Sequence, residues 1–172
     1  MKLLVKFSTC LLIFFIILSS HTIKSQDMQK PDPVKNETFD LIMGKWSAEP
    51  YEMMGEKYNE TANHYMKYGQ FMFVDIQGSN DKGQTYNGTI IIKPGKDDSF
   101  TGWAFDDWGS VTTYSGTAKG NKISLTGKSD WGTETREITI NGDKMEHKVT
   151  MTMVGTDGKD MTFNQTITYK KQ

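Results

Sequence analysis

Histidines are the first side chains to consider for chemistry, and the sequence contains three of them: His21, His64 and His147. A catalytic zinc ion usually takes three protein ligands. His64 and His147 lie far apart in the sequence and would still need a carboxylate. No glycine-rich phosphate loop, nucleophile elbow or paired-histidine motif is present. We therefore assign no catalytic residue, metal site or cofactor, and we interpret His147 as a hydrogen-bonded interior histidine.

Two copies of the tripeptide Asp-Trp-Gly, at 107–109 and 130–132, indicate a binding site more than a catalytic one. A tryptophan ring has a large apolar face and one N–H donor, which suits contact with an amphipathic molecule. Methionine is flexible and adapts to irregular apolar shapes. The predicted apolar binding residues are Trp103, Trp108, Trp131, Met53 and Met54. The alternative is that the rings fold back as caps on tight turns, with the aspartates binding the turn amides.

Arg136 is the only arginine in the sequence. A guanidinium group can hold a ligand carboxylate through two hydrogen bonds, so Arg136 is also a candidate ligand-binding residue. Exposed ion pairs are common, and we expect a surface pair with Glu134 or Glu137 instead of an inward side chain. If the protein is an enzyme, Asp106 or Asp130 is the candidate acid, and a raised carboxyl pKa inside a cavity would favour that role.

The first 25 residues have the layout of a secretory signal. Lys2 and Lys6 form a basic start, residues 11–18 are uninterrupted apolar side chains, and residues 19–25 are mostly small or polar. The apolar run is shorter than the roughly 20 residues that span a bilayer as a helix. We expect cleavage near Ser25 and an extracytoplasmic protein, periplasmic or secreted, without a stable membrane anchor.

Cleavage at that point changes the composition of the working chain. It removes the only cysteine, Cys10, so neither a disulfide nor a thiolate metal site is expected. It also removes Lys2, Lys6 and Lys24 but no acid, which leaves 17 basic and 21 acidic residues and a net charge of −4. Nucleic-acid binding needs clustered positive charge, so no nucleic-acid partner is expected. The oligomeric state is not predicted.

Residues 26–36 are polar, contain two of the four prolines and predict a flexible arm. A single barrel domain is predicted over 37–172, beginning with one short helical turn at 37–43. After it, runs of β-forming residues alternate with turns rich in Gly, Asn and Asp. The predicted strands are 45–51, 57–68, 70–78, 84–93, 99–106, 110–118, 122–131, 133–141, 144–154 and 160–170. This all-β antiparallel meander is expected to close into a barrel, because closure removes the exposed edges.

Alternation within the strands predicts which side chains face the interior. In 144–154 the inward set is Met145, His147, Val149, Met151 and Met153. Such a mixture fits either a lined cavity or a solid methionine-rich core. Strand direction places the turns at 52–56, 79–83, 107–109, 131–132 and 155–159 on one rim, and ligands enter barrels at such a mouth.

The motif Gly44-Lys45-Trp46 at the start of the first strand resembles the opening of lipocalin-like (calycin) barrels. That resemblance implies that a basic side chain from the last strand, Lys170 or Lys171 here, packs over the tryptophan. A wider resemblance covers roughly 39–170 and points to the bacterial domain of unknown function 1579 family. It is carried by Gly44-Lys45-Trp46, Gly88-Thr89-Ile90, Gly102-Trp103, Asp106-Asp107-Trp108-Gly109, Tyr114-Ser115-Gly116 and Arg136-Glu137. It implies a lipocalin-like barrel, often exported, and no reaction.

The sequence therefore predicts an exported lipocalin-like protein that binds a small apolar or amphipathic ligand in its barrel. Two alternatives stay open: an exported enzyme with an acidic site at the barrel mouth, and an interaction module without a pocket. The shape of the interior is what distinguishes them, because the fold alone does not decide function.

Overall fold

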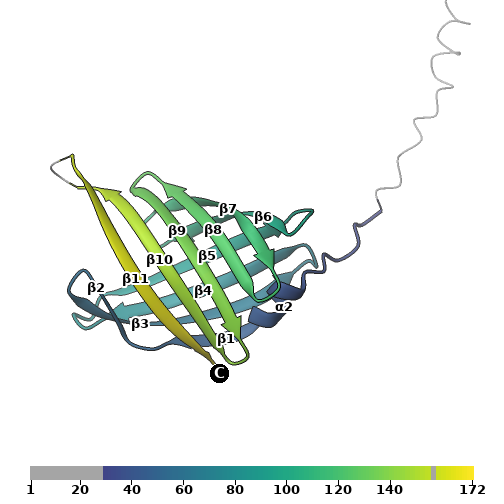
Figure 1. Ribbon diagram of the computed structural model, residues 1–172, viewed down its shortest axis with the longest axis horizontal. Coiled ribbons are helices and arrows are strands. Elements are labelled where there is room, and N and C mark those ends of the chain that lie inside the picture. The colour runs from purple at the N-terminus through teal and green to yellow at the C-terminus, as the bar shows by residue number, and fades with distance from the viewer. Residues whose placement is uncertain (1–28, 156–157) are drawn as a thin grey trace, which may run out of the picture. The chain divides into compact units, whose positions relative to one another are not determined.

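One short helix precedes eleven strands in the computed structural model, which describes residues 29–155 and 158–172 (Figure 1). The predicted secretory signal lies outside these residues. No helix within them is long and apolar enough to cross a membrane. The elements are α2 (Glu37–Ile42), β1 (Gly44–Ala48), β2 (Tyr51–Met53), β3 (Glu56–Lys67), β4 (Phe71–Asn80), β5 (Thr85–Pro94), β6 (Ser99–Asp106), β7 (Val111–Lys119), β8 (Lys122–Ser129), β9 (Gly132–Asn141), β10 (Lys144–Val154) and β11 (Asp160–Lys171).

The strands form one closed antiparallel sheet in which each long strand pairs with the next. Strand β1 closes the ring, because Trp46 lies opposite Lys171 of β11 on one side and Ala62 of β3 on the other. Strand β2 continues along β3 after a break at Glu49-Pro50. Proline has no backbone N–H to donate to a ladder, which fits this break. Counting β1 and β2 as one bent strand, the predicted ten-strand antiparallel barrel is confirmed.

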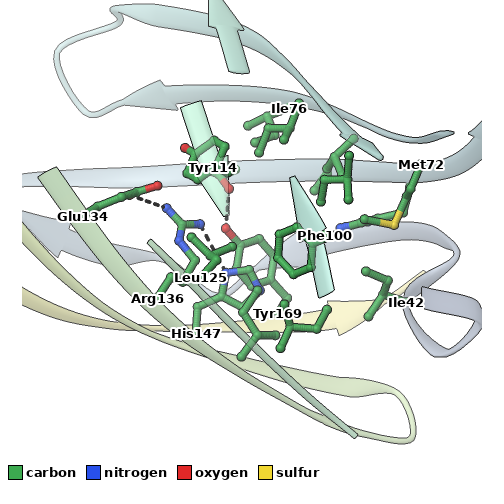
Figure 2. Close-up of a pocket in the computed structure, with 18 residues that line it drawn as sticks. Ile42, Met72, Ile76, Phe100, Tyr114, Leu125, Glu134, Arg136, His147 and Tyr169 are labelled. Carbon is green, nitrogen blue, oxygen red and sulfur yellow. Dashed lines mark hydrogen bonds and ion pairs between the residues drawn. The ribbon is translucent and has the colours of Figure 1, made fainter. Parts of the chain in front are cut away.

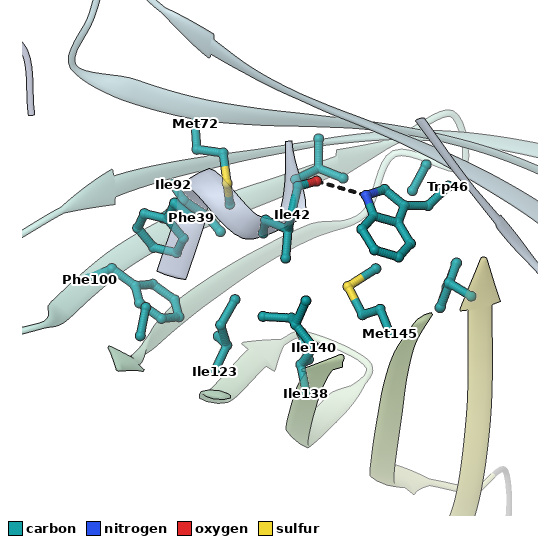
Figure 3. Packing of buried hydrophobic residues seen from close by; sticks show 14 of the residues in the cluster. Phe39, Ile42, Trp46, Met72, Ile92, Phe100, Ile123, Ile138, Ile140 and Met145 are labelled. Carbon is teal, nitrogen blue, oxygen red and sulfur yellow. Dashed lines mark hydrogen bonds between the residues drawn. The ribbon is translucent and has the colours of Figure 1, made fainter. Parts of the chain in front are cut away.

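The hydrophobic core fills the end of the barrel that α2 covers (Figure 3). Trp46 is fully buried there, and its Nε1–H donates to the Ile42 carbonyl at 2.8 Å. Gly44 has a φ of +104°, a conformation that a side chain would strain, and it lets the chain turn sharply from helix into strand. The Lys171 ammonium lies 5.3 Å from the Trp46 ring centroid, so the predicted basic side chain over the tryptophan is confirmed.

Helix α2 forms where the sequence predicts a helical turn, and its first turn is held by several contacts. The Asn36 side chain caps it by accepting a hydrogen bond from the Phe39 amide at 3.0 Å. The Thr38 hydroxyl donates to the Gly120 carbonyl in the β7–β8 turn at 2.9 Å. The Phe39 ring meets Phe100 edge to face, with centroids 5.8 Å apart. The helix therefore closes this end of the barrel.

Residues 32–34 of the predicted flexible arm lie against the turn between β3 and β4. The Val34 amide donates to the Gly69 carbonyl at 2.8 Å, and the Gln70 side chain donates to the Asp32 carbonyl at 2.7 Å. Residues 32–34 are thus held by backbone hydrogen bonds.

We expect Trp46→Phe to lower the free energy of unfolding by about 1–3 kcal/mol, because it removes the bond to Ile42 and leaves a gap in a packed core. Chemical denaturation measures this loss. The matched control is Trp103→Phe on the outer wall, where a change within about 0.5 kcal/mol is expected. Equal losses in the two variants would contradict the role assigned to Trp46.

Candidate functional site

A cavity of about 470 Å³ lies inside the open end of the barrel. Strands β6 to β10 and two of their turns form its wall. We call it the mouth cavity. It is lined by Asp106, Trp108, Ser110, Thr112, Tyr114, Gly127, Ser129, Trp131, Gly132, Thr133, Glu134, Met151, Thr152 and Met153. The volume falls in the range of about 300–1,000 Å³ that is usual for small-molecule sites.

Trp108 and Trp131 come together at this cavity from the two Asp-Trp-Gly turns. Their exposed fractions are 77% and 66%, so the rings do not fold back onto the protein. The turn amides are bound by Asp106, which precedes the first tripeptide: its Oδ1 accepts hydrogen bonds from the amides of Trp108 at 3.0 Å and Ser110 at 2.9 Å. The turn is therefore fixed by Asp106 while its tryptophan stays open to solvent.

Three of the predicted apolar binding residues lie elsewhere. Trp103 lies on the outer face of β6, because the inward side chains of that strand are the even-numbered ones, such as Phe100. Met54 is 61% exposed at the β2–β3 turn, and neither it nor Met53 lines the mouth cavity. The alternation of β6 turns Trp103 outward, so it does not line the mouth cavity.

Below the mouth cavity lies a much smaller inner cavity of about 60 Å³ (Figure 2). That volume accommodates a few water molecules. It is well below the size of an ordinary ligand site. The two expectations for the interior, cavity and solid core, are each met in one half of the barrel. A ligand of ordinary size is restricted to the upper half.

Arg136 points into the barrel, contrary to the expected surface position, although its predicted partner Glu134 is the right one. The guanidinium Nη2 lies 3.2 Å from Glu134 Oε2, and the side chains are only 21% and 12% exposed. Arg136 Nη1 lies 3.4 Å from His147 Nδ1. The pair is buried because residues 134, 136, 138 and 140 of β9 all face inward. Burial makes such a charge costly unless it is paired, and here it is paired.

A second carboxylate, Glu60 of β3, is held by the hydroxyl groups of three tyrosines. Tyr51 donates at 3.3 Å, and Tyr86 and Tyr169 donate through shorter bonds. Burial and the Glu60 charge raise the pKa of Tyr51 to about 12 and raise that of Tyr169 well above its usual range. Glu60 thereby ties β2, β5 and β11 together across the interior.

Tyr114 and Glu134 line both cavities and form the boundary between them. Gly127 makes their close approach feasible, since a Cβ atom there would lie 2.6 Å from the Tyr114 ring and 2.8 Å from Glu134 Cγ. Burial acts to raise the pKa of Glu134, but the Arg136 charge and a hydrogen bond from Tyr114 outweigh it and lower that pKa. Glu134 is therefore an anion at neutral pH.

Four buried polar atoms at the inner cavity have no hydrogen-bond partner within the described residues: Arg136 Nε, Glu134 Oε1, His147 Nε2 and His64 Nδ1. A guanidinium can only donate, so His147 Nδ1 must accept from Arg136 and Nε2 must carry the proton. The inner cavity thus presents two N–H donors, on Arg136 and His147, and two acceptors, Glu134 Oε1 and His64 Nδ1.

Both interior histidines are neutral. Burial lowers the pKa of His64 to about 4, although a hydrogen bond to the Gly44 backbone acts in the opposite direction. Burial, then the Arg136 charge, lowers the pKa of His147 well below 6.5. Among the described residues, no three His, Cys, Asp or Glu side chains are grouped to hold a metal ion.

Sequence reasoning missed Glu60 and the role of Met151 and Met153 as walls of the mouth cavity. The alternation of the sequence predicts that both methionines face inward, but it does not show that they lie at the level of the mouth cavity. Glu60 shares a face of β3 with Ala62 and His64, and this carboxylate within an inward run is the signal that could have identified it.

The sequence matches no family model and no curated protein. The family suggested by the sequence motifs therefore stays a prediction. Among solved structures, the chain is similar to the crystal structure of Rv2717c from M. tuberculosis, with a TM-score of 0.62 and 15% identity over 77% of this chain and 93% of that chain. A designed fluorescence-activating β-barrel matches with a TM-score of 0.45 and 12% identity over 80% of this chain and 100% of that chain. The first similarity supports the barrel fold.

We expect the free energy of unfolding to fall as the pH drops from 6.5 to about 4. In this window His64 and His147 take up protons in the unfolded chain but not in the fold, so acid favours unfolding. At about pH 5 each histidine contributes a loss of about 1–2 kcal/mol. Chemical denaturation of the wild type, His64→Gln and His147→Gln at several pH values measures the slope. Each variant should flatten it, and an unchanged slope in both would contradict the assignment.

We expect Glu60→Ala to lower the free energy of unfolding by about 2–4 kcal/mol, because it leaves three tyrosine hydroxyls without their acceptor. Glu137→Ala is the matched control. Glu137 accepts one hydrogen bond from Ser124 at 2.6 Å on the outer face, and its loss should matter little. A loss for Glu60→Ala no larger than that of the control would show that the tyrosine cluster does not stabilise the barrel.

Proposed function

We propose that this protein binds a small amphipathic molecule in the mouth cavity and acts as a carrier or scavenger, not as an enzyme. The observation that carries this proposal is the 470 Å³ cavity bounded by Trp108, Trp131, Met151 and Met153. Apolar walls and a few polar groups are typical of small-molecule sites. The inner cavity of about 60 Å³ is too small for such a molecule, so the ligand occupies the upper half of the barrel.

We further propose that the protein works outside the cytoplasm. The signal-like pattern of residues 1–25 supports export, and the net charge of −4 on the remaining chain argues against a nucleic-acid partner. An extracytoplasmic barrel with an open mouth suits the capture of molecules from dilute solution.

An enzymatic alternative would use an acid at the mouth, and two observations weigh against its candidates. The Asp106 carboxylate accepts two turn amides and so serves the backbone. Asp130 does not line the mouth cavity. The cavity itself weighs against an interaction module without a pocket. Binding is therefore the function that the geometry supports best.

Titration with N-phenyl-1-naphthylamine, an uncharged apolar fluorophore, tests this proposal. We expect saturable binding with one site per chain and a change in tryptophan emission. Trp108→Ala and Trp131→Ala should each weaken binding by about tenfold, because each removes a large apolar contact. Trp103→Ala is the matched control on the outer wall and should bind as the wild type does. Absence of saturable binding, or equal weakening in all three variants, would contradict a site at the mouth.

A further inference from the structure

The charged side chains that line the mouth cavity carry one sign. Asp106 and Glu134 are both acidic, and no lysine or arginine of the described residues contributes to the lining. Arg136 lines only the inner cavity, beneath Glu134. A charged group that enters the mouth therefore meets negative potential first.

Glu134 also brings a buried, charged carboxylate to the boundary between the inner cavity and the mouth cavity. Its Oε2 is paired with Arg136 at 3.2 Å, while its buried Oε1 has no partner within the part of the chain that the structure describes. A buried carboxylate with an unpartnered oxygen is costly, and a cation bound beside it compensates part of that cost through its charge. Glu134 lies on the lining of the mouth cavity, where a ligand can approach it.

Arg136 is not placed to attract a carboxylate ligand, although its residue type suggested that role. Its guanidinium is engaged by Glu134 and by His147, and its side chain is only 21% exposed. Glu134 stands between it and the mouth. A carboxylate would have to pass Glu134 and compete with it, which costs the repulsion between two like charges.

The aromatic walls favour the same sign of ligand charge as the carboxylates do. Trp108 and Trp131 present exposed indole faces at the rim. The face of an indole ring attracts a cation, and tryptophan does so most strongly of the aromatic side chains. Met151 and Met153 supply further apolar surface in the same cavity.

We propose that the mouth cavity selects amphiphiles whose polar end is a cationic ammonium group over those whose polar end is a carboxylate. The apolar tail packs against Trp108, Trp131 and the two methionines, and the ammonium group lies between Asp106 and Glu134. This inference rests on the proposed binding function and names the class of its ligand.

Three ligands with the same alkyl tail test this selectivity: octylammonium, octanol and octanoate. They differ only in a positive, neutral or negative end at neutral pH. Calorimetry measures binding to the whole protein as it is produced, without the signal if the signal is cleaved. The ionic strength is physiological, so that distant charges are screened. We expect octylammonium to bind about tenfold more tightly than octanoate, with octanol between them.

Two variants test whether the preference for octylammonium over octanoate arises from the lining of the mouth cavity. Glu134→Gln and Asp106→Asn should each reduce the ratio of octylammonium to octanoate affinity several-fold and leave octanol affinity nearly unchanged. Asparagine at 106 keeps the oxygen that binds the turn amides, so this variant should fold even if the loss of the Glu134 charge destabilises the barrel. Asp130→Asn is the matched control, because Asp130 adjoins Trp131 but does not line the cavity.

The outcomes separate this inference from the function on which it rests. Octanoate binding as tightly as octylammonium overturns the cationic preference but leaves a binding protein. An unchanged ratio in Asp106→Asn, or a ratio lowered equally in Asp130→Asn, also overturns it, because the preference would not arise from the cavity lining. Failure of all three ligands, and of the uncharged fluorophore, overturns the proposed function itself.

Discussion

Strand β1 pairs with β11 on one side and with β3 on the other, and every other feature of the interior depends on this double pairing. It turns an open meander into a ring with no free edge at that point. The Trp46 indole lies fully buried beside the junction, bonded to the end of α2 and covered by Lys171. Closure forces alternate side chains of all the long strands into one enclosed space.

The side chains that fill this enclosed space change in character along the barrel axis. Near α2 it is filled by apolar side chains (Figure 3). Toward the middle it holds polar ones, among them Glu134, Arg136, His147, Tyr114 and Tyr169 (Figure 2). Buried ion pairs add little net stability compared with apolar packing, because desolvation offsets their attraction. The Arg136–Glu134 pair is therefore better explained as part of a site than as a device for stability. Its position at the floor of the mouth cavity agrees with that explanation.

The mouth cavity combines three kinds of surface. Exposed indoles at the rim, methionines along one wall and acidic groups without a basic neighbour in the lining all belong to β6–β10 and their turns. The opposite wall of the barrel contributes neither tryptophan nor charge to it. The proposed ligand site thus lies on one side of the mouth. The preferred ligand charge is positive because carboxylates line that side.

The sequence by itself determined the strands, their order and the barrel, because period-two alternation and turn residues are local signals. Trp108 and Trp131 could be placed on one rim for the same reason, since strand direction alone sets the rim. Only the tertiary structure decided that Arg136 is buried with Glu134 and that Glu60 gathers three tyrosines. These facts depend on which inward side chains share a height in the closed ring, and that follows from the register between strands distant in sequence.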